Sequence, residues 1–109
     1  MQSAYELKSK TLGHYVLELL EEYRIEKSPN TVESLESKAR RIIKRFGKRQ
    51  IASIVQSDIR RFKVKMHKEG LKNKTINEHY TLLRAVFRCA MEDGVITVNP
   101  MEGIKNLPV

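Results

Sequence analysis

The chain has 109 residues and a mass of 12.7 kDa, which is enough for one domain with a single hydrophobic core. Lys and Arg number 21 against 13 Asp and Glu, so the formal net charge is +8 and the pI about 9.8, and we expect a polyanionic partner. A hydrophobic content of 40% argues against a disordered chain, and the apolar stretches are too short for a membrane-spanning helix.

The first predicted element is a helix over residues 12–26. Thr11 is placed to cap its N-terminus, and apolar residues recur along it at helical spacing. This apolar face consists of Leu12, Tyr15, Val16, Leu19, Leu20 and Tyr23. The helix is expected to end before Ser28, because Pro29 biases the residue that precedes it away from helical backbone angles.

A second helix is predicted over residues 31–46. Asn30 can cap it, and Glu33 follows at the spacing of a capping-box pair. Its apolar stripe consists of Val32, Leu35, Ala39, Ile42, Ile43 and Phe46. Gly47 supplies the stop.

Residues 48–56 are predicted to cross the core as a short extended connector. A third helix should follow over residues 58–69, with Ser57 as its N-cap and Asp58 at the positive end of the helix dipole. Gly70 ends this helix.

A fourth helix is predicted over residues 74–93, with Gly94 as its stop. Two capping arrangements fit its start, Asn73 alone or Thr75 with Glu78, and the sequence leaves both open. Its apolar arc consists of Ile76, His79, Tyr80, Leu82, Leu83, Val86, Phe87, Ala90 and Met91. Because this arc exceeds half the circumference, we expect the helix to be packed on two sides at the centre of a bundle.

The ends of the chain have a composition typical of linkers. Residues 1–10 are expected to form an N-terminal tail, residues 11–99 the folded domain, and residues 100–109 a linker. Two tails of this kind indicate a piece of a longer protein.

Two rows of polar and basic side chains contain no acidic residue. The second helix carries Ser34, Lys38, Arg41 and Arg45, and the fourth carries Lys74, Asn77, Thr81, Arg84 and Arg88. We expect only an external anion to offset the repulsion within the second-helix row, and such side chains suit phosphates and base edges. Residues 72–77 add a helix N-terminus whose free N–H groups can bind a phosphate. On the third helix Arg61, Lys65 and Lys68 also align, but there solvation or a peripheral contact is favoured.

No group of residues in the sequence has the pattern of an active site or a metal centre. His14, His67 and His79 form no His-x-x-x-His pair, and His79 is expected to pack at the edge of the core. Cys89, the single cysteine, cannot form an internal disulfide and is expected to be a half-buried thiol. We therefore expect no metal, no cofactor and no membrane contact, and a cytoplasmic location.

The order and spacing of several short motifs carry a resemblance to a known family. The motifs are a second helix that ends in Arg45-Phe46-Gly47, an Ile-x-x-Ile link, Ser57-Asp58-Ile59, Gly70-Leu-x-x-Lys-Thr-Ile-Asn77, Leu83-Arg-Ala-Val-Phe-Arg-x-Ala90 and Gly94-Val-Ile-x-x-Asn-Pro100. Each motif alone is weak, but together, over about residues 10–105, they closely resemble the core-binding domain of tyrosine recombinases of the phage-integrase type.

The resemblance implies an all-α fold, a compact four-helix SAM-like bundle, that forms half of a clamp on duplex DNA during DNA integration and recombination. In the family the second and fourth helices lie across the major groove. The DNA-binding positions implied here are Ser34, Lys38, Arg41, Arg45, Lys72, Asn73, Lys74, Thr75, Asn77, Thr81, Arg84 and Arg88. The implied partners are duplex DNA, a catalytic domain of the same polypeptide and other recombinase protomers on DNA.

The chain departs from the family in its chemistry. Catalysis in the family uses a tyrosine, two arginines, a lysine and histidines with a His-x-x-Arg motif, and no histidine here precedes an arginine at that spacing. We therefore expect this chain to bind DNA without cutting it, with the catalytic domain beyond residue 109. An alternative is a basic helical module that binds RNA or an acidic protein partner. The small number of exposed aromatic side chains disfavours RNA, because recognition of single-stranded RNA relies on stacking.

Overall fold

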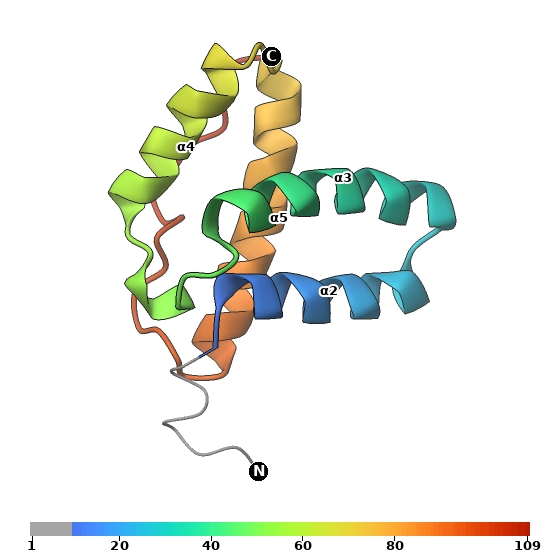
Figure 1. Ribbon diagram of the computed structural model, residues 1–109, viewed down its shortest axis with the longest axis vertical. Helices are drawn as coiled ribbons and strands as arrows, with labels where there is room; N and C mark the ends of the chain where they lie inside the picture. The colour runs from blue at the N-terminus through green and yellow to red at the C-terminus, as the bar shows by residue number, and fades with distance from the viewer. Residues whose placement is uncertain (1–9) are drawn as a thin grey trace.

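The computed structural model describes residues 10–109, and this part of the chain is all-α, as predicted. Its elements are α2 (Leu12–Glu26), α3 (Pro29–Phe46), the short 3₁₀ helix η1 (Ile51–Ser53), α4 (Gln56–Lys68) and α5 (Asn73–Glu92). α2 and α3 form an antiparallel hairpin that packs across α5, and α4 lies beside the first half of α5 (Figure 1). All of the predicted tail except its last residue, Lys10, lies outside the described residues.

The start of α2 agrees with the prediction and is closed by the loop after α3. Thr11 Oγ1 accepts a hydrogen bond from the backbone N–H of His14 at 3.1 Å. The N–H of Leu12 donates to Arg49 O at 2.9 Å, and that of Gly13 donates to Gly47 O at 3.1 Å. These bonds satisfy donors that the first turn of a helix leaves free. The α2 N-terminus is therefore not open to an external anion.

α3 begins two residues earlier than predicted, and Asn30 is not its cap. Ser28 has extended backbone angles and its Oγ accepts from the N–H of Thr31 at 3.3 Å. Pro29 then occupies the first helical position, where the N–H that proline lacks would have no partner in the helix anyway. The proline that was expected only to separate two helices therefore opens the second one.

The connector before α4 is not fully extended, because residues 51–53 form η1. Ile51 and Ile54 are buried in the core, which agrees with the predicted crossing. α4 begins at Gln56 and its N-cap is Val55, so the prediction of Ser57 as the cap is wrong. Instead the carboxylate of Asp58 accepts from the N–H of Val55 at 2.9 Å. This is the half of a capping box that the third helical residue supplies.

Neither predicted cap serves α5, whose N-cap Lys72 makes no side-chain hydrogen bond to the helix. Its C-terminus ends as predicted. Gly94 has a φ of +74°, and the N–H of Val95 donates to Ala90 O at 3.0 Å. This 6→1 bond and the left-handed glycine form a Schellman motif. Gly70, which follows α4, also has a positive φ, of +88°.

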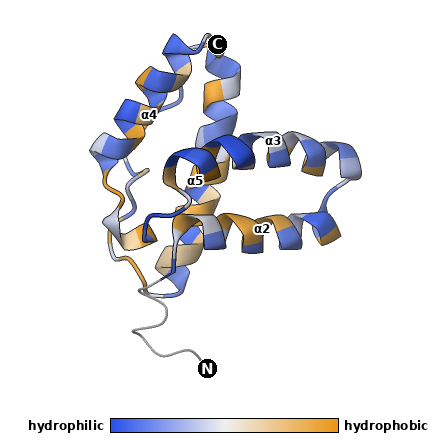
Figure 2. Cartoon of the chain, in the orientation of Figure 1, coloured by the Kyte–Doolittle hydropathy of each residue, from blue (hydrophilic) through white to orange (hydrophobic). Residues whose placement is uncertain are grey.

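α5 is the central helix, as its wide apolar arc predicted. Nine of its residues are buried, and they contact the apolar faces of the other three helices. Figure 2 shows this division, with apolar residues concentrated on α2 and α5 and hydrophilic residues along the outer sides of α3 and α4. Burying apolar surface in one shared core stabilises the bundle and fixes the relative positions of α3 and α5.

Candidate nucleic-acid interface

The basic residues predicted on α3 form one row, Ser34, Lys38, Arg41 and Arg45, which we call the α3 row. Lys38 Nζ donates to Ser34 Oγ at 3.1 Å and lies 3.6 Å from Glu78 Oε2 of α5. Because Glu78 lies within one helical turn of Lys74 and Thr81, this pair places the α3 row beside the outer polar face of α5. Two surfaces predicted separately are thus neighbours.

The other half of the α3 row faces α4. Arg41 Nη1 donates to Glu69 Oε2 at 2.7 Å, whereas Arg45 makes no ion pair within residues 10–109. A hollow of about 280 Å³ opens here, and its walls include Arg41, Arg45, Lys44 and Lys65. Lys65 of α4, which was expected to be merely solvated or peripheral, therefore lies against the α3 row.

The expectation that only an external anion would offset the charge of the α3 row is wrong. Glu69 and Glu78 provide carboxylates from other elements to two of its three cations. The hydrogen bond from Arg41 is the main reason that the pKa of Glu69 is lowered, so this carboxylate remains ionised.

The polar row predicted on α5 divides into two faces. Lys74, Thr81 and Arg88 are exposed and recur at seven-residue steps, and we call them the outer α5 row. A seven-residue step turns a straight helix by only about 20°, so their side chains follow one nearly straight line. Arg88 is 3.8 Å from Glu92 but is itself 66% exposed, so this pair is weak.

The second face of α5 lies against residues 104–108, which we call the C-terminal segment. Asn77 Nδ2 donates to Leu107 O at 2.9 Å, while its Oδ1 accepts from the N–H of Leu107 at 2.7 Å. Asn73 Nδ2 donates to Pro108 O at 2.8 Å, and Arg84 Nη2 donates to Ile104 O at 3.1 Å. These three candidate DNA-binding side chains are thus engaged within the protein.

The start of α5 lies beside these rows, and no side-chain cap closes it. Lys72 and Lys74 are exposed on either side of its first residue, and Thr75 is partly buried. The first-turn N–H groups and the two ammonium groups together favour an anion here. Unlike the first N–H groups of α2, those of residues 73–75 have no acceptor within residues 10–109.

Beneath the junction of the two rows lies His79, which is 2% exposed. Its Nδ1 donates to Thr75 O at 2.8 Å, and within residues 10–109 its Nε2 has no hydrogen-bond partner. Burial lowers the pKa of His79, and the nearby charges of Arg41 and Lys38 lower it further. The imidazole is therefore neutral at pH 7.

The tyrosines of the described residues are poorly suited to nucleophilic chemistry. Burial is the first cause of the raised pKa of Tyr15, Tyr23 and Tyr80. Tyr15 also donates its hydroxyl proton to Asp93 Oδ2 at 2.8 Å, which ties α2 to the end of α5. A tyrosine nucleophile needs activation towards the phenolate, and these surroundings act in the opposite direction.

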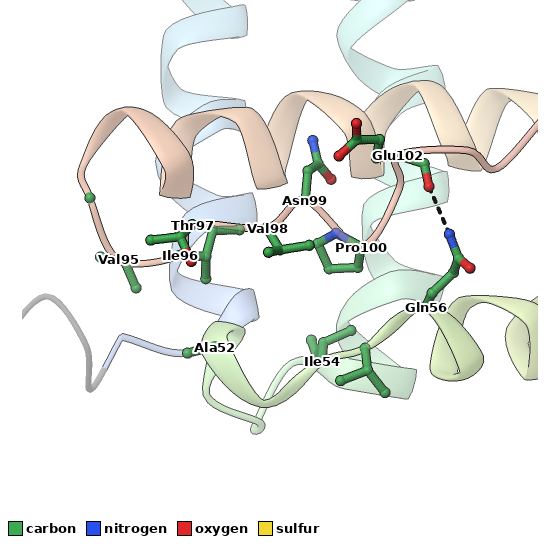
Figure 3. A pocket seen from close by; sticks show the side chains of 12 residues that line it. Ala52, Ile54, Gln56, Val95, Ile96, Thr97, Val98, Asn99, Pro100 and Glu102 are labelled. Carbon is green, nitrogen blue, oxygen red and sulfur yellow. Dashed lines mark hydrogen bonds between the residues drawn. The ribbon is translucent and has the colours of Figure 1, made fainter.

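A separate hollow of about 760 Å³ lies between residues 52–56 and residues 94–102 (Figure 3). Its lining combines polar and apolar groups in nearly equal measure, and Gln56 Nε2 donates across it to Glu102 O at 2.7 Å. Within residues 10–109 there is no group of three His, Cys, Asp or Glu side chains placed to hold a metal ion. In the same range no helix combines the length and apolarity needed to cross a membrane.

Comparison with known proteins gives one family and one curated relative. The family model described as the N-terminal SAM-like domain of phage integrases matches residues 14–94. The ICEBs1 integrase of Bacillus subtilis (strain 168) is 31% identical over 64 residues, which is 59% of this chain and 17% of that protein. The match thus covers a little under a fifth of the length of that relative. No solved structure gives a significant match.

Proposed function

Because the chain belongs to the family of phage integrase N-terminal SAM-like domains, we propose that it binds duplex DNA as the core-binding half of a clamp in a site-specific tyrosine recombinase. Residues 11–99 form the DNA-binding unit in this proposal, and residues 100–109 lead towards a catalytic domain of the same polypeptide. DNA integration and recombination, and contacts with other protomers on DNA, belong to that larger protein.

One observation carries the proposal. The α3 row and the outer α5 row are neighbours on one surface, joined at the contact between Lys38 and Glu78. Of the cations on this surface, Arg45 and Lys74 have no carboxylate partner within residues 10–109. Uncompensated cations on two rigid, adjacent helices suit the phosphates of a duplex, which are spaced along a regular backbone.

The geometry suggests different tasks for different residues. The open N-terminus of α5, with Lys72 and Lys74, is suited to one phosphate. Thr81 and Arg88 extend along α5 from that point, where they can contact base edges or the backbone in the major groove. Since Asn73, Asn77 and Arg84 bind the C-terminal segment, their contribution to DNA binding requires that segment to move.

The test is duplex binding measured by fluorescence anisotropy over a series of salt concentrations. With roughly five phosphates neutralised, the logarithm of the association constant should fall with the logarithm of salt concentration at a slope of about −4 to −5. The double variant Arg45→Ala with Lys74→Ala should bind more weakly and flatten the slope by about 0.9 for each lost phosphate contact.

The matched control removes two exposed cations from elsewhere, Lys27→Ala with Arg61→Ala. Lys27 follows the far end of α2, and Arg61 is on α4 beside Asp58. Both double variants change the net charge equally, so an equal loss of affinity would contradict the assignment of the face. Tighter binding to single-stranded RNA than to duplex DNA would favour the RNA alternative instead.

A further inference from the structure

Two carboxylates from other elements hold two cations of the α3 row. Glu69, the C-cap of α4, accepts a hydrogen bond from Arg41 Nη1 at 2.7 Å, and Glu78 of α5 lies 3.6 Å from Lys38 Nζ. The Arg41 side chain is 35% exposed and that of Lys38 is 16% exposed. Both cations therefore reach the surface, but each is already in contact with an anion of the protein.

The position of Glu69 is not explained by the stability of α4. The C-terminus of a helix carries partial negative charge, which disfavours a carboxylate and favours cations. The last turn of α4 otherwise follows this rule, since it contains Lys65, His67 and Lys68. Glu69 departs from it, and its carboxylate is placed between Lys65 at 3.5 Å and Arg41 at 2.7 Å. The contacts of Glu69 with Lys65 and Arg41, rather than its position at the end of α4, favour a negatively charged residue there.

We propose that Glu69 and Glu78 limit the affinity of this surface for DNA by competing with phosphates for Arg41 and Lys38. This inference rests on the proposed binding of duplex DNA by the α3 row. A phosphate that binds Arg41 competes with a carboxylate that already accepts a hydrogen bond from its Nη1, and this carboxylate, whether displaced or kept, lies near the phosphate and repels it. Arg45 and the outer α5 row face no such competition from a residue of another element.

As a consequence, the cations of this surface contribute unequally to its affinity for DNA. Because of this competition, Arg41 and Lys38 contribute little affinity for an arbitrary duplex. They contribute more affinity where the DNA positions a phosphate or base acceptor well. Both carboxylates are thus positioning residues. They favour well-matched DNA sites over random ones, because their competition cancels the affinity of weak contacts and only reduces that of strong ones.

The experiment compares Glu69→Gln and Glu78→Gln with Glu33→Gln in the full chain. Glu33 is exposed on α3 and makes no ion pair within residues 10–109, so its replacement changes the net charge by the same amount. The first two variants should bind duplex about 1.5-fold to fivefold more tightly than the Glu33 variant, the range expected for releasing an exposed ion pair. Each should also make the salt slope more negative by about 0.9, because a freed cation releases one more counterion.

A double-mutant comparison separates release of Arg41 from a general charge effect. Arg41→Ala should cost more affinity in the Glu69→Gln background than in the unmodified chain, since only in the former does Arg41 bind phosphate without competition from the Glu69 carboxylate. Equal costs, or equal tightening by all three Gln variants, would overturn the competition. If the unmodified chain and every variant, each verified as folded by circular dichroism, failed to bind duplex at all, the proposed function itself would be wrong.

Discussion

Among residues 10–109, His79 is the only buried polar residue apart from the tyrosines, and it lies where the α3 row meets α5. Its ring packs edge-on against Phe62 at a centroid distance of 6.0 Å, and only one of its two nitrogens is hydrogen-bonded. Protonation would place a charge in an apolar site beside Lys38 and Arg41, with no partner for the second N–H. The native state therefore depends on the neutral form of this histidine.

The first prediction is that acid destabilises the domain through His79. The folded-state pKa of His79 is lowered from its ordinary 6.5, so the unfolded chain binds this proton more readily. The stabilising contribution is complete above pH 6.5 and is lost as pH falls below that value, by about 1.4 kcal/mol for each unit that separates the two pKa values. Urea unfolding at about pH 7.5 and pH 5.5 measures it.

His79→Leu should remove most of this pH dependence. The matched control is His67→Leu, because His67 is exposed at the end of α4 and its replacement removes the same titratable group. Asp58 does not interfere, since the hydrogen bond from Arg49 lowers its pKa below an ordinary value that is already 3.8. A pH dependence that persisted in the His79 variant would assign it to other groups.

At the scale of elements, α5 has three kinds of surface: an apolar arc in the core, the outer α5 row in solvent and a polar face under the C-terminal segment. The third surface is built from side-chain amides that bond to backbone groups. Asn77 alone makes two such bonds to Leu107, and Ile104 and Leu107 pack against the core. Such contacts hold a segment in place without depending on most of its side chains.

The second prediction is that Asn77→Ala releases the C-terminal segment and leaves the helices intact. The amide proton of Leu107 should lose its protection from hydrogen exchange, because its acceptor is removed. The free energy of unfolding should fall by only about 1–2 kcal/mol, the worth of one or two such bonds. Thr81→Ala, on the exposed face of the same helix, is the control and should leave Leu107 protected. Retained protection in the Asn77 variant would contradict the described contacts.

Local rules predicted the elements of this fold better than their starts. Helix periodicity identified all four helices and glycines marked the ends of three of them, because both signals come from neighbouring residues. The start of α4 was misplaced because its N-cap is the apolar Val55, and that of α3 because two polar residues, Ser28 and Asn30, competed as caps. Pro29, which suits the first turn of a helix, was the deciding signal.

The candidate interface was less predictable, because its contacts join residues far apart in the chain. The row pattern identified the basic residues of α3 but not the carboxylate of Glu69, which is 28 positions from Arg41. It likewise grouped Asn77 with Lys74, although the partner of Asn77 is Leu107, 30 positions away. Helix periodicity shows which side chains share a face, and only the packing of elements shows what that face meets.

At the scale of the whole molecule, the net charge of +8 is spread over a small domain and its ion pairs are mostly exposed. Exposed pairs contribute little to stability, whereas the repulsion between many like charges acts on the whole folded state. Salt should therefore affect folding and binding in opposite directions.

The third prediction is that added sodium chloride raises the melting temperature while it weakens duplex binding. Screening reduces the repulsion in the folded state, whose charges are closer together than in the unfolded chain. The double variant Glu26→Gln with Glu33→Gln increases the net charge by two and should show a steeper rise. Differential scanning calorimetry over a range of salt concentrations measures the melting temperatures of the unmodified chain and of the double variant. A melting temperature that fell with salt would mean that attractive pairs outweigh the repulsion.

The C-terminal segment also determines where the chain leaves the domain. Pro108 is bonded to Asn73, so the chain departs beside the first turn of α5 and close to Lys72 and Lys74 (Figure 1). A module joined after residue 109 would thus start at the edge of the proposed DNA surface. Release of the five residues of the segment would lengthen that tether by about 17 Å, at about 3.4 Å per residue. Since effective concentration falls as a tether grows beyond the span of its sites, in the proposed clamp the amides of α5 would act on how strongly one half recruits the other.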